Sequence, residues 1–71
     1  MKYVITDLGE VAVGGSYHLE LAKALEGKVI AAGHYRLVDG GRRVEVFGQS
    51  HAFSIQAMPQ DAFLVARHLG L

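Results

Sequence analysis

The sequence predicts a small α/β (α+β) fold in which two helices pack on a mainly antiparallel or mixed sheet, in the order β(β)αββα. Three observations support this fold class. Short segments rich in β-branched and aromatic residues alternate with glycine-rich breaks, two other segments carry apolar residues at helical spacing, and a glycine-rich turn joins two extended stretches. With 71 residues, the chain forms one domain over positions 1–71.

The first part of the chain predicts one strand and a possible second one. Lys2 to Asp7 is β-branched and aromatic, which is typical of a strand. Gly9-Glu10 predicts a turn, and Val11 to Val13 a short second strand. Gly14-Gly15 then predicts a break before the first helix.

The first helix is predicted between Ser16 and Gly27. The Ser16 hydroxyl is a suitable N-cap, and Gly27 suits the left-handed residue that follows a last turn. One face carries the apolar positions and a histidine, at spacings i, i+3, i+4 and i+7: His18, Leu21, Ala22 and Leu25.

The middle of the chain predicts a β-hairpin. Val29 to Val38 is extended, Asp39-Gly40-Gly41 is a hairpin turn, and Arg43 to Phe47 alternates as a half-buried strand does. Val44 and Val46 share one face of that strand.

The last part predicts a loop and a second helix. Gln49 to Met58 shows no clear period and is expected to be a loop. Pro59 suits the first position of a helix that ends at Gly70. Its apolar stripe consists of Ala62, Val65, Ala66 and Leu69.

The composition of the chain argues against some classes of function and location. Seven basic and seven acidic side chains cancel, so the chain has no basic field for nucleic acid or for a membrane surface. It lacks cysteine and a signal-like apolar run, so a cytoplasmic location is expected. Because 51% hydrophobic residues is rich for a chain without a disulfide or metal staple, we expect a homodimer, with an unusually dense core as the alternative.

His18 is the first candidate for chemistry, since it begins a helix on the apolar face. The partial positive charge of a helix N-terminus disfavours an imidazolium ion, so a neutral ring there suits a general base or a nucleophile. The alternative is a histidine at the edge of the core with one satisfied ring nitrogen. The four histidines show no metal-ligand spacing, so no metal and no cofactor are predicted.

Two segments are candidates for anion binding, although an ordinary structural role explains each of them by itself. Gly14-Gly15-Ser16 could present backbone N–H groups to an anion, although a loop with a cap explains it equally well. Ser50-His51-Ala52 leaves a strand, and successive N–H groups in such a turn can form an anion nest, with an ordinary strand exit as the alternative.

Four pieces in order resemble the Janus/Ocnus family of protein phosphohistidine phosphatases. Lys2 to Ile5 is similar to its first strand, Ser16-Tyr17-His18 to its Tyr-His helix start, and Gly33 to Leu37 to its arginine-bearing strand. Val44 to Phe53 resembles its strand and Tyr-Ser-Met-Ala-Tyr phosphate loop. The sequence departs from the family in lacking a basic residue over Glu10 to Gly14 and in lacking the family's final strand.

This resemblance implies hydrolysis of a phosphoramidate bond in a phosphorylated protein or a small phosphoramidate. His18 would be the catalytic base or nucleophile. The phosphoryl group would be held by Lys2, Tyr17, Arg36, Ser50, His51 and Ala52. Two alternatives stay open: a non-catalytic module that binds phosphate or a phosphoprotein, and a small homodimeric interaction protein without an anion site.

Overall fold

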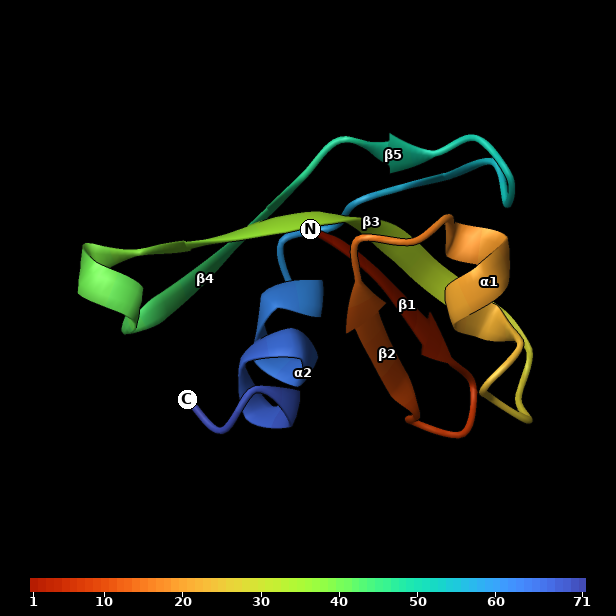
Figure 1. Ribbon diagram of the computed structural model, residues 1–71, viewed down its shortest axis with the longest axis horizontal. Coiled ribbons are helices and arrows are strands. Elements are labelled where there is room, and N and C mark those ends of the chain that lie inside the picture. The colour runs from red at the N-terminus through yellow and green to blue at the C-terminus, as the bar shows by residue number, and fades with distance from the viewer.

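A four-stranded antiparallel sheet in the order β2-β1-β3-β4 forms the centre of the computed structural model, which describes residues 1–71 (Figure 1). A two-stranded antiparallel sheet, β5-β6, lies beyond it. The predicted α+β class is therefore confirmed. The elements are β1 (Lys2–Thr6), β2 (Val11–Gly14), α1 (His18–Ala22), β3 (Val29–Val38), η1 (Asp39–Gly41), β4 (Arg43–Phe47), β5 (Gln49–Ser50), β6 (Ile55–Gln56) and α2 (Asp61–His68).

The two helices lie on opposite faces of the sheet. Tyr3 stands opposite Val13 and Gly33, so these positions share one face, and α2 packs there through the fully buried Val65. Lys2 stands opposite His34 on the other face, against which α1 lies. The core lies mainly under α2 and consists of Tyr3, Ile5, Ala31, Tyr35, Val44 and Val65, with Val11, Val13, Val46, Ala57, Ala62, Ala66 and Leu69 packed around it.

The first helix is much shorter than predicted. It spans His18–Ala22, and its N-cap is Tyr17 without a side-chain bond, so the predicted Ser16 cap is wrong. The chain leaves the helix because the Glu10 carboxylate accepts the backbone N–H groups of Glu26 and Gly27, the latter at 2.7 Å. Gly27 has no positive φ; instead an added Cβ would lie 2.7 Å from Thr6 Oγ1.

The predicted hairpin turn is confirmed, and the loop after it is corrected. Asp39, Gly40 and Gly41 have φ values of 53°, 67° and 87°, a left-handed run that glycine tolerates. The segment predicted as a loop, Gln49 to Met58, contains the β5-β6 hairpin, whose strands are too short to show a period in the sequence. In addition, β1 ends at Thr6, one residue earlier than predicted, and Gly14 belongs to β2.

The second helix begins later than predicted. Pro59 and Gln60 form a turn, in which the Asp61 N–H donates to the Met58 carbonyl at 2.9 Å, and α2 starts at Asp61. The Asp61 carboxylate accepts the Met58 N–H in return, at 3.0 Å. The apolar stripe of α2 faces the core as predicted, and Gly70 follows the helix with φ 80°.

Candidate functional site

The ring of His18 is fixed by one backbone hydrogen bond. It is the first residue of α1, it is buried, and its Nε2 lies 2.8 Å from the carbonyl oxygen of Gly33 on β3. Because a carbonyl only accepts, Nε2 must carry the proton, and Nδ1 is therefore the nitrogen with a lone pair. No group of the chain hydrogen-bonds to Nδ1. His18 thus has one nitrogen used for orientation and one available for chemistry.

His34 lies beside His18 and was missed as a site residue. The ring centroids are 5.5 Å apart with an edge-on angle of 84°. Burial lowers the pKa of His34, and the nearby His18, Lys2 and N-terminal amine lower it further, against a raising contribution from a backbone hydrogen bond with Gln49. His34 therefore stays neutral near pH 7 and adds no cationic charge next to His18. No local pattern in the sequence marks it, because its place follows from the register that sets it opposite Lys2.

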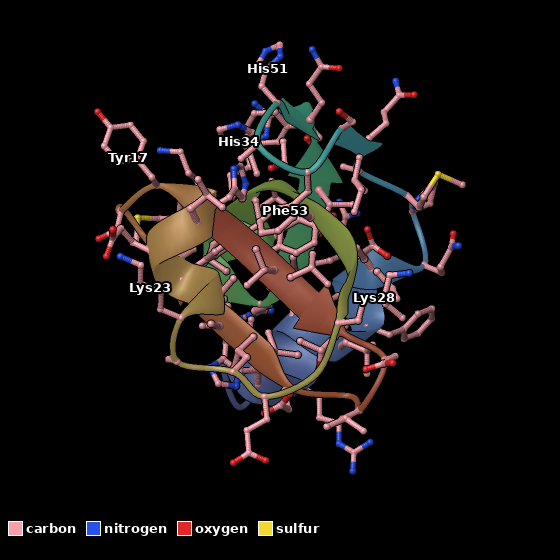
Figure 2. The ribbon with its side chains drawn as sticks, turned by 90° about the vertical axis from the view of Figure 1, so that its right-hand side faces the viewer. Tyr17, Lys23, Lys28, His34, His51 and Phe53 are labelled. Carbon is pink, nitrogen blue, oxygen red and sulfur yellow. The ribbon has the colours of Figure 1, made fainter.

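A cavity of about 370 Å³ opens next to these two rings. Figure 2 shows Tyr17, His34 and His51 at the same end of the molecule. Five of the seven predicted site residues line this cavity, from three separate parts of the chain. The lining consists of Lys2, Tyr17, His18, Leu19, His34, Gln49, His51 and Ala52.

The predicted anion nest supplies unused donors. The backbone N–H groups of His51 and Ala52 have no acceptor within the chain. Ser50 does not line the cavity, although both of its chain neighbours do; it is 1% exposed, and its buried hydroxyl has no hydrogen-bond partner. Polar groups of this kind are rare in native proteins unless a ligand or water completes them. The segment therefore has free hydrogen-bonding capacity beside the cavity.

Gly48 allows the chain before Ser50 to lie close to His34. Its φ is 72°, and an added Cβ would lie 2.9 Å from His34 Cδ2. A side chain at this position would therefore be strained and would push against the imidazole. Glycine here lets the chain pass from β4 into β5 close to His34.

The charge of the cavity comes from one lysine. Lys2 Nζ lies 6.0 Å from the centre of the Tyr17 ring, a cation–π contact at the mouth of the cavity, where Tyr17 is 78% exposed. The structure does not bring Arg36 to this cavity. Its Nε donates to Glu45 at 2.8 Å, and its guanidinium lies 5.1 Å from the centre of the Phe47 ring. Phe47 in turn stacks on His34 at 5.7 Å, so it separates Arg36 from the histidine pair.

Two further findings concern metals and membranes. No group of three or more histidine, cysteine, aspartate or glutamate side chains is placed to hold a metal ion. None of the helices has both the length and the apolarity that a membrane crossing requires. The donor groups that line the cavity include imidazole, ammonium, the Tyr17 phenol and backbone N–H groups.

No family model matches the chain, and neither the curated proteins nor the solved structures contain a match. The resemblance to the Janus/Ocnus family therefore stays a prediction. What the site does has to be inferred from its own groups: one oriented imidazole, one ammonium group and a loop with unused donors.

Proposed function

We propose that this protein is a cytoplasmic hydrolase of phosphoramidate bonds, acting on phosphohistidine in a protein or on a small phosphoramidate. The observation that carries the proposal is the hydrogen bond from His18 Nε2 to the Gly33 carbonyl, which leaves Nδ1 free at a cavity with phosphate donors. Phosphoryl transfer depends mainly on positioning and on stabilisation of charge, so a site with few groups suits it.

In the proposed step, His18 Nδ1 removes a proton from a water molecule. The oxygen of that water bonds to phosphorus, the P–N bond breaks, and the leaving nitrogen takes up the proton. Direct attack of Nδ1 on phosphorus, followed by hydrolysis of the phosphorylated imidazole, is the other course open to the same atom. In either course the Gly33 carbonyl keeps the ring in one orientation.

The phosphoryl oxygens would be held by donors from Ser50, the last residue of β5, to Ala52. The backbone N–H groups of His51 and Ala52 are free, and the Ser50 hydroxyl is buried without a partner. Lys2 supplies the positive charge, and Tyr17 orients the substrate at the mouth. Arg36, which the resemblance also implied, is engaged by Glu45 and has no part in this scheme.

The test is release of phosphate from a phosphohistidine peptide by wild type and by His18→Ala. We expect the variant to lose roughly 10²–10⁴-fold in turnover, the range of general acid–base catalysis. His68→Ala is the matched control, because His68 is exposed on α2 at the other face of the sheet. Equal turnover by wild type and a folded His18→Ala would refute the role of His18.

A phosphate-binding module without turnover is the second candidate, and one observation favours it. The cavity holds a single lysine, because Arg36 is paired elsewhere and the segment Glu10 to Gly14 has no basic residue. This candidate predicts saturable phosphate binding at Ser50 and its neighbours, seen by amide NMR, with no release of phosphate by wild type.

A further inference from the structure

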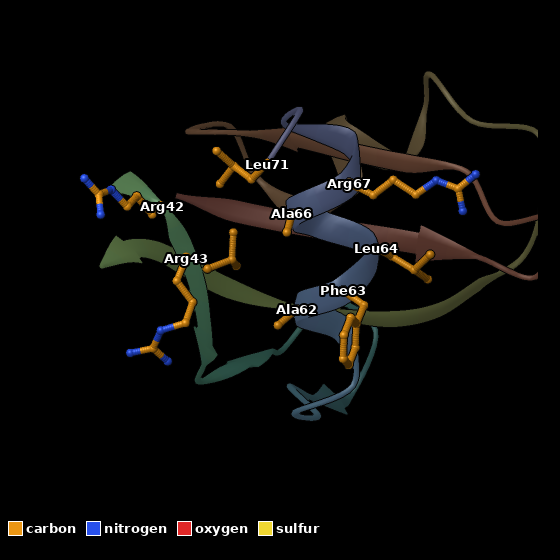
Figure 3. A pocket seen from close by; sticks show the side chains of 9 residues that line it. Arg42, Arg43, Ala62, Phe63, Leu64, Ala66, Arg67 and Leu71 are labelled. Atoms are coloured by element: carbon orange, nitrogen blue, oxygen red, sulfur yellow. The ribbon is translucent and has the colours of Figure 1, made fainter. Parts of the chain in front are cut away.

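A second and larger cavity lies on the opposite face of the sheet, between α2 and β4 (Figure 3). Its volume is about 630 Å³, and no residue of the candidate site lines it. We call it the α2–β4 groove. Its lining consists of Arg42, Arg43, Val44, Ala62, Phe63, Leu64, Ala66, Arg67 and Leu71.

The α2–β4 groove exposes large apolar side chains to water. Phe63 is 80% exposed and Leu71 is 51% exposed, whereas Val44 at the base of the groove is buried. Apolar surface gains free energy when it leaves water, and a contiguous exposed apolar patch with polar neighbours is typical of an interaction site. The groove therefore has the surface chemistry of an interface.

The charged side chains of the groove are all cationic. Three arginines line it and no acidic residue does, although the chain as a whole has zero net charge. Arg43 Nε donates to Asp39 at 2.8 Å, but Arg42 and Arg67 have no carboxylate within 4 Å. Guanidinium groups bind carboxylates through paired N–H donors. The free charges of the groove thus favour an acidic occupant.

The backbone beside the groove is also unpaired. In the order β2-β1-β3-β4, strand β4 is at the edge of the sheet, so its outer N–H and C=O groups have no partner strand. An extended segment can add to such an edge, with alternate side chains facing the groove. A second copy of this chain bound by a two-fold axis would instead bring arginines against arginines.

We propose that the α2–β4 groove binds an extended acidic segment of another protein. Its apolar side chains lie against Phe63 and Val44, and its carboxylates pair with Arg42 and Arg67. This inference does not depend on the proposed hydrolase activity, because the groove and the His18 cavity share no residue.

The test uses a fluorescent peptide of alternating glutamate and leucine, with alternating lysine and leucine as the control peptide. Binding is followed by fluorescence anisotropy at low and high salt. We expect saturable binding of the acidic peptide alone, with amide NMR shifts in α2 and β4. The double variant Arg42→Gln, Arg67→Gln should lose up to about fivefold in affinity for each guanidinium removed.

A matched double variant, Lys23→Gln with Lys28→Gln, removes the same charge from outside the groove and should change affinity by less than about twofold. Equal weakening by both double variants, or no binding of the acidic peptide, would overturn the proposal. Light scattering that shows a dimer of wild type broken by Phe63→Ser would also overturn it, in favour of a second copy. Phosphate release by Arg42→Gln, Arg67→Gln should equal that of wild type, so the groove and the hydrolase are tested separately.

Discussion

The two faces of the sheet differ in whether their polar groups have hydrogen-bond partners within the chain. Under α2, the phenol of Tyr3 is fully buried and donates to Asp61 Oδ2 at 2.6 Å, and the same carboxylate oxygen accepts the Met58 N–H. Burial and the neighbouring Asp61 carboxylate raise the pKa of Tyr3 far above its usual range, so the phenol keeps its proton. Every group of this cluster has its partner within the chain, which leaves nothing for a ligand.

On the α1 face, the corresponding groups are left incomplete. His18 uses only Nε2, and the N–H groups of His51 and Ala52 have no acceptor. The hydroxyl of Ser50, the preceding residue in the chain, is buried without a partner. Local rules of polar satisfaction are broken mainly where a protein binds or reacts. The face under α2 therefore stabilises the fold, whereas the α1 end of the sheet keeps the unpaired polar groups on which the proposed function rests.

The largest effect on stability is expected on the face under α2. Asp61→Ala leaves the buried Tyr3 phenol without its acceptor and removes the bond from the Met58 N–H. Hydrogen bonds to a charged group contribute roughly 1.5–3 kcal/mol each, so the free energy of unfolding should fall by about 3 kcal/mol or more. Urea unfolding measures this change.

The matched control for Asp61→Ala is Glu20→Ala, which removes an exposed helical carboxylate paired with Lys23 and should cost less than about 1 kcal/mol. The imidazole NMR signals of His18 and His34 should stay in place in folded Asp61→Ala. Movement of those signals would show that the two faces of the sheet are coupled. It would contradict the separation of a stabilising face under α2 from a face that carries the candidate site.

Local patterns in the sequence predicted the parts of the fold that depend on local contacts. The stripe of α2 and the turn at Asp39 to Gly41 follow from residues within one or two turns of each other. The early end of α1 does not, because it is set by hydrogen bonds that the Glu10 carboxylate accepts from backbone N–H groups 16 and 17 residues later. A helical period cannot report such a distant acceptor.

The candidate site was predictable in the same partial way. His18 and the segment from Ser50 to Ala52 carry their own signals, a helix start and a strand exit. His34 carries none, because its role arises from the register that puts it opposite Lys2 and from the packing of α1 on that face. Arg36 was expected at the phosphate, but Glu45 stands directly opposite it on β4 and engages its guanidinium.

A smaller effect on stability is expected from His34, which lies on the α1 face. Its pKa is lowered in the folded state, so below about pH 6.5 the unfolded chain binds a proton that the folded chain does not. Stability should therefore fall as pH drops below that value, by at most about 1.4 kcal/mol per pH unit. His34→Gln should flatten this loss in urea unfolding, whereas His68→Gln, at an exposed position, should keep it. The same loss in wild type and His34→Gln would contradict the assignment.

The smallest effect on stability is expected from a substitution of Ser50. This substitution also tests most directly whether the two faces of the sheet differ in their unpaired polar groups. Its hydroxyl is buried without a partner, so Ser50→Ala removes a desolvated group and no hydrogen bond. The free energy of unfolding should stay unchanged or rise by up to about 1 kcal/mol, while the affinity for inorganic phosphate, measured by amide NMR, should fall. Ser16→Ala, at an exposed site, should change neither quantity. A clear loss of stability in Ser50→Ala would mean that the hydroxyl already hydrogen-bonds to bound water. The polar groups near the cavity would then be as fully hydrogen-bonded as those under α2.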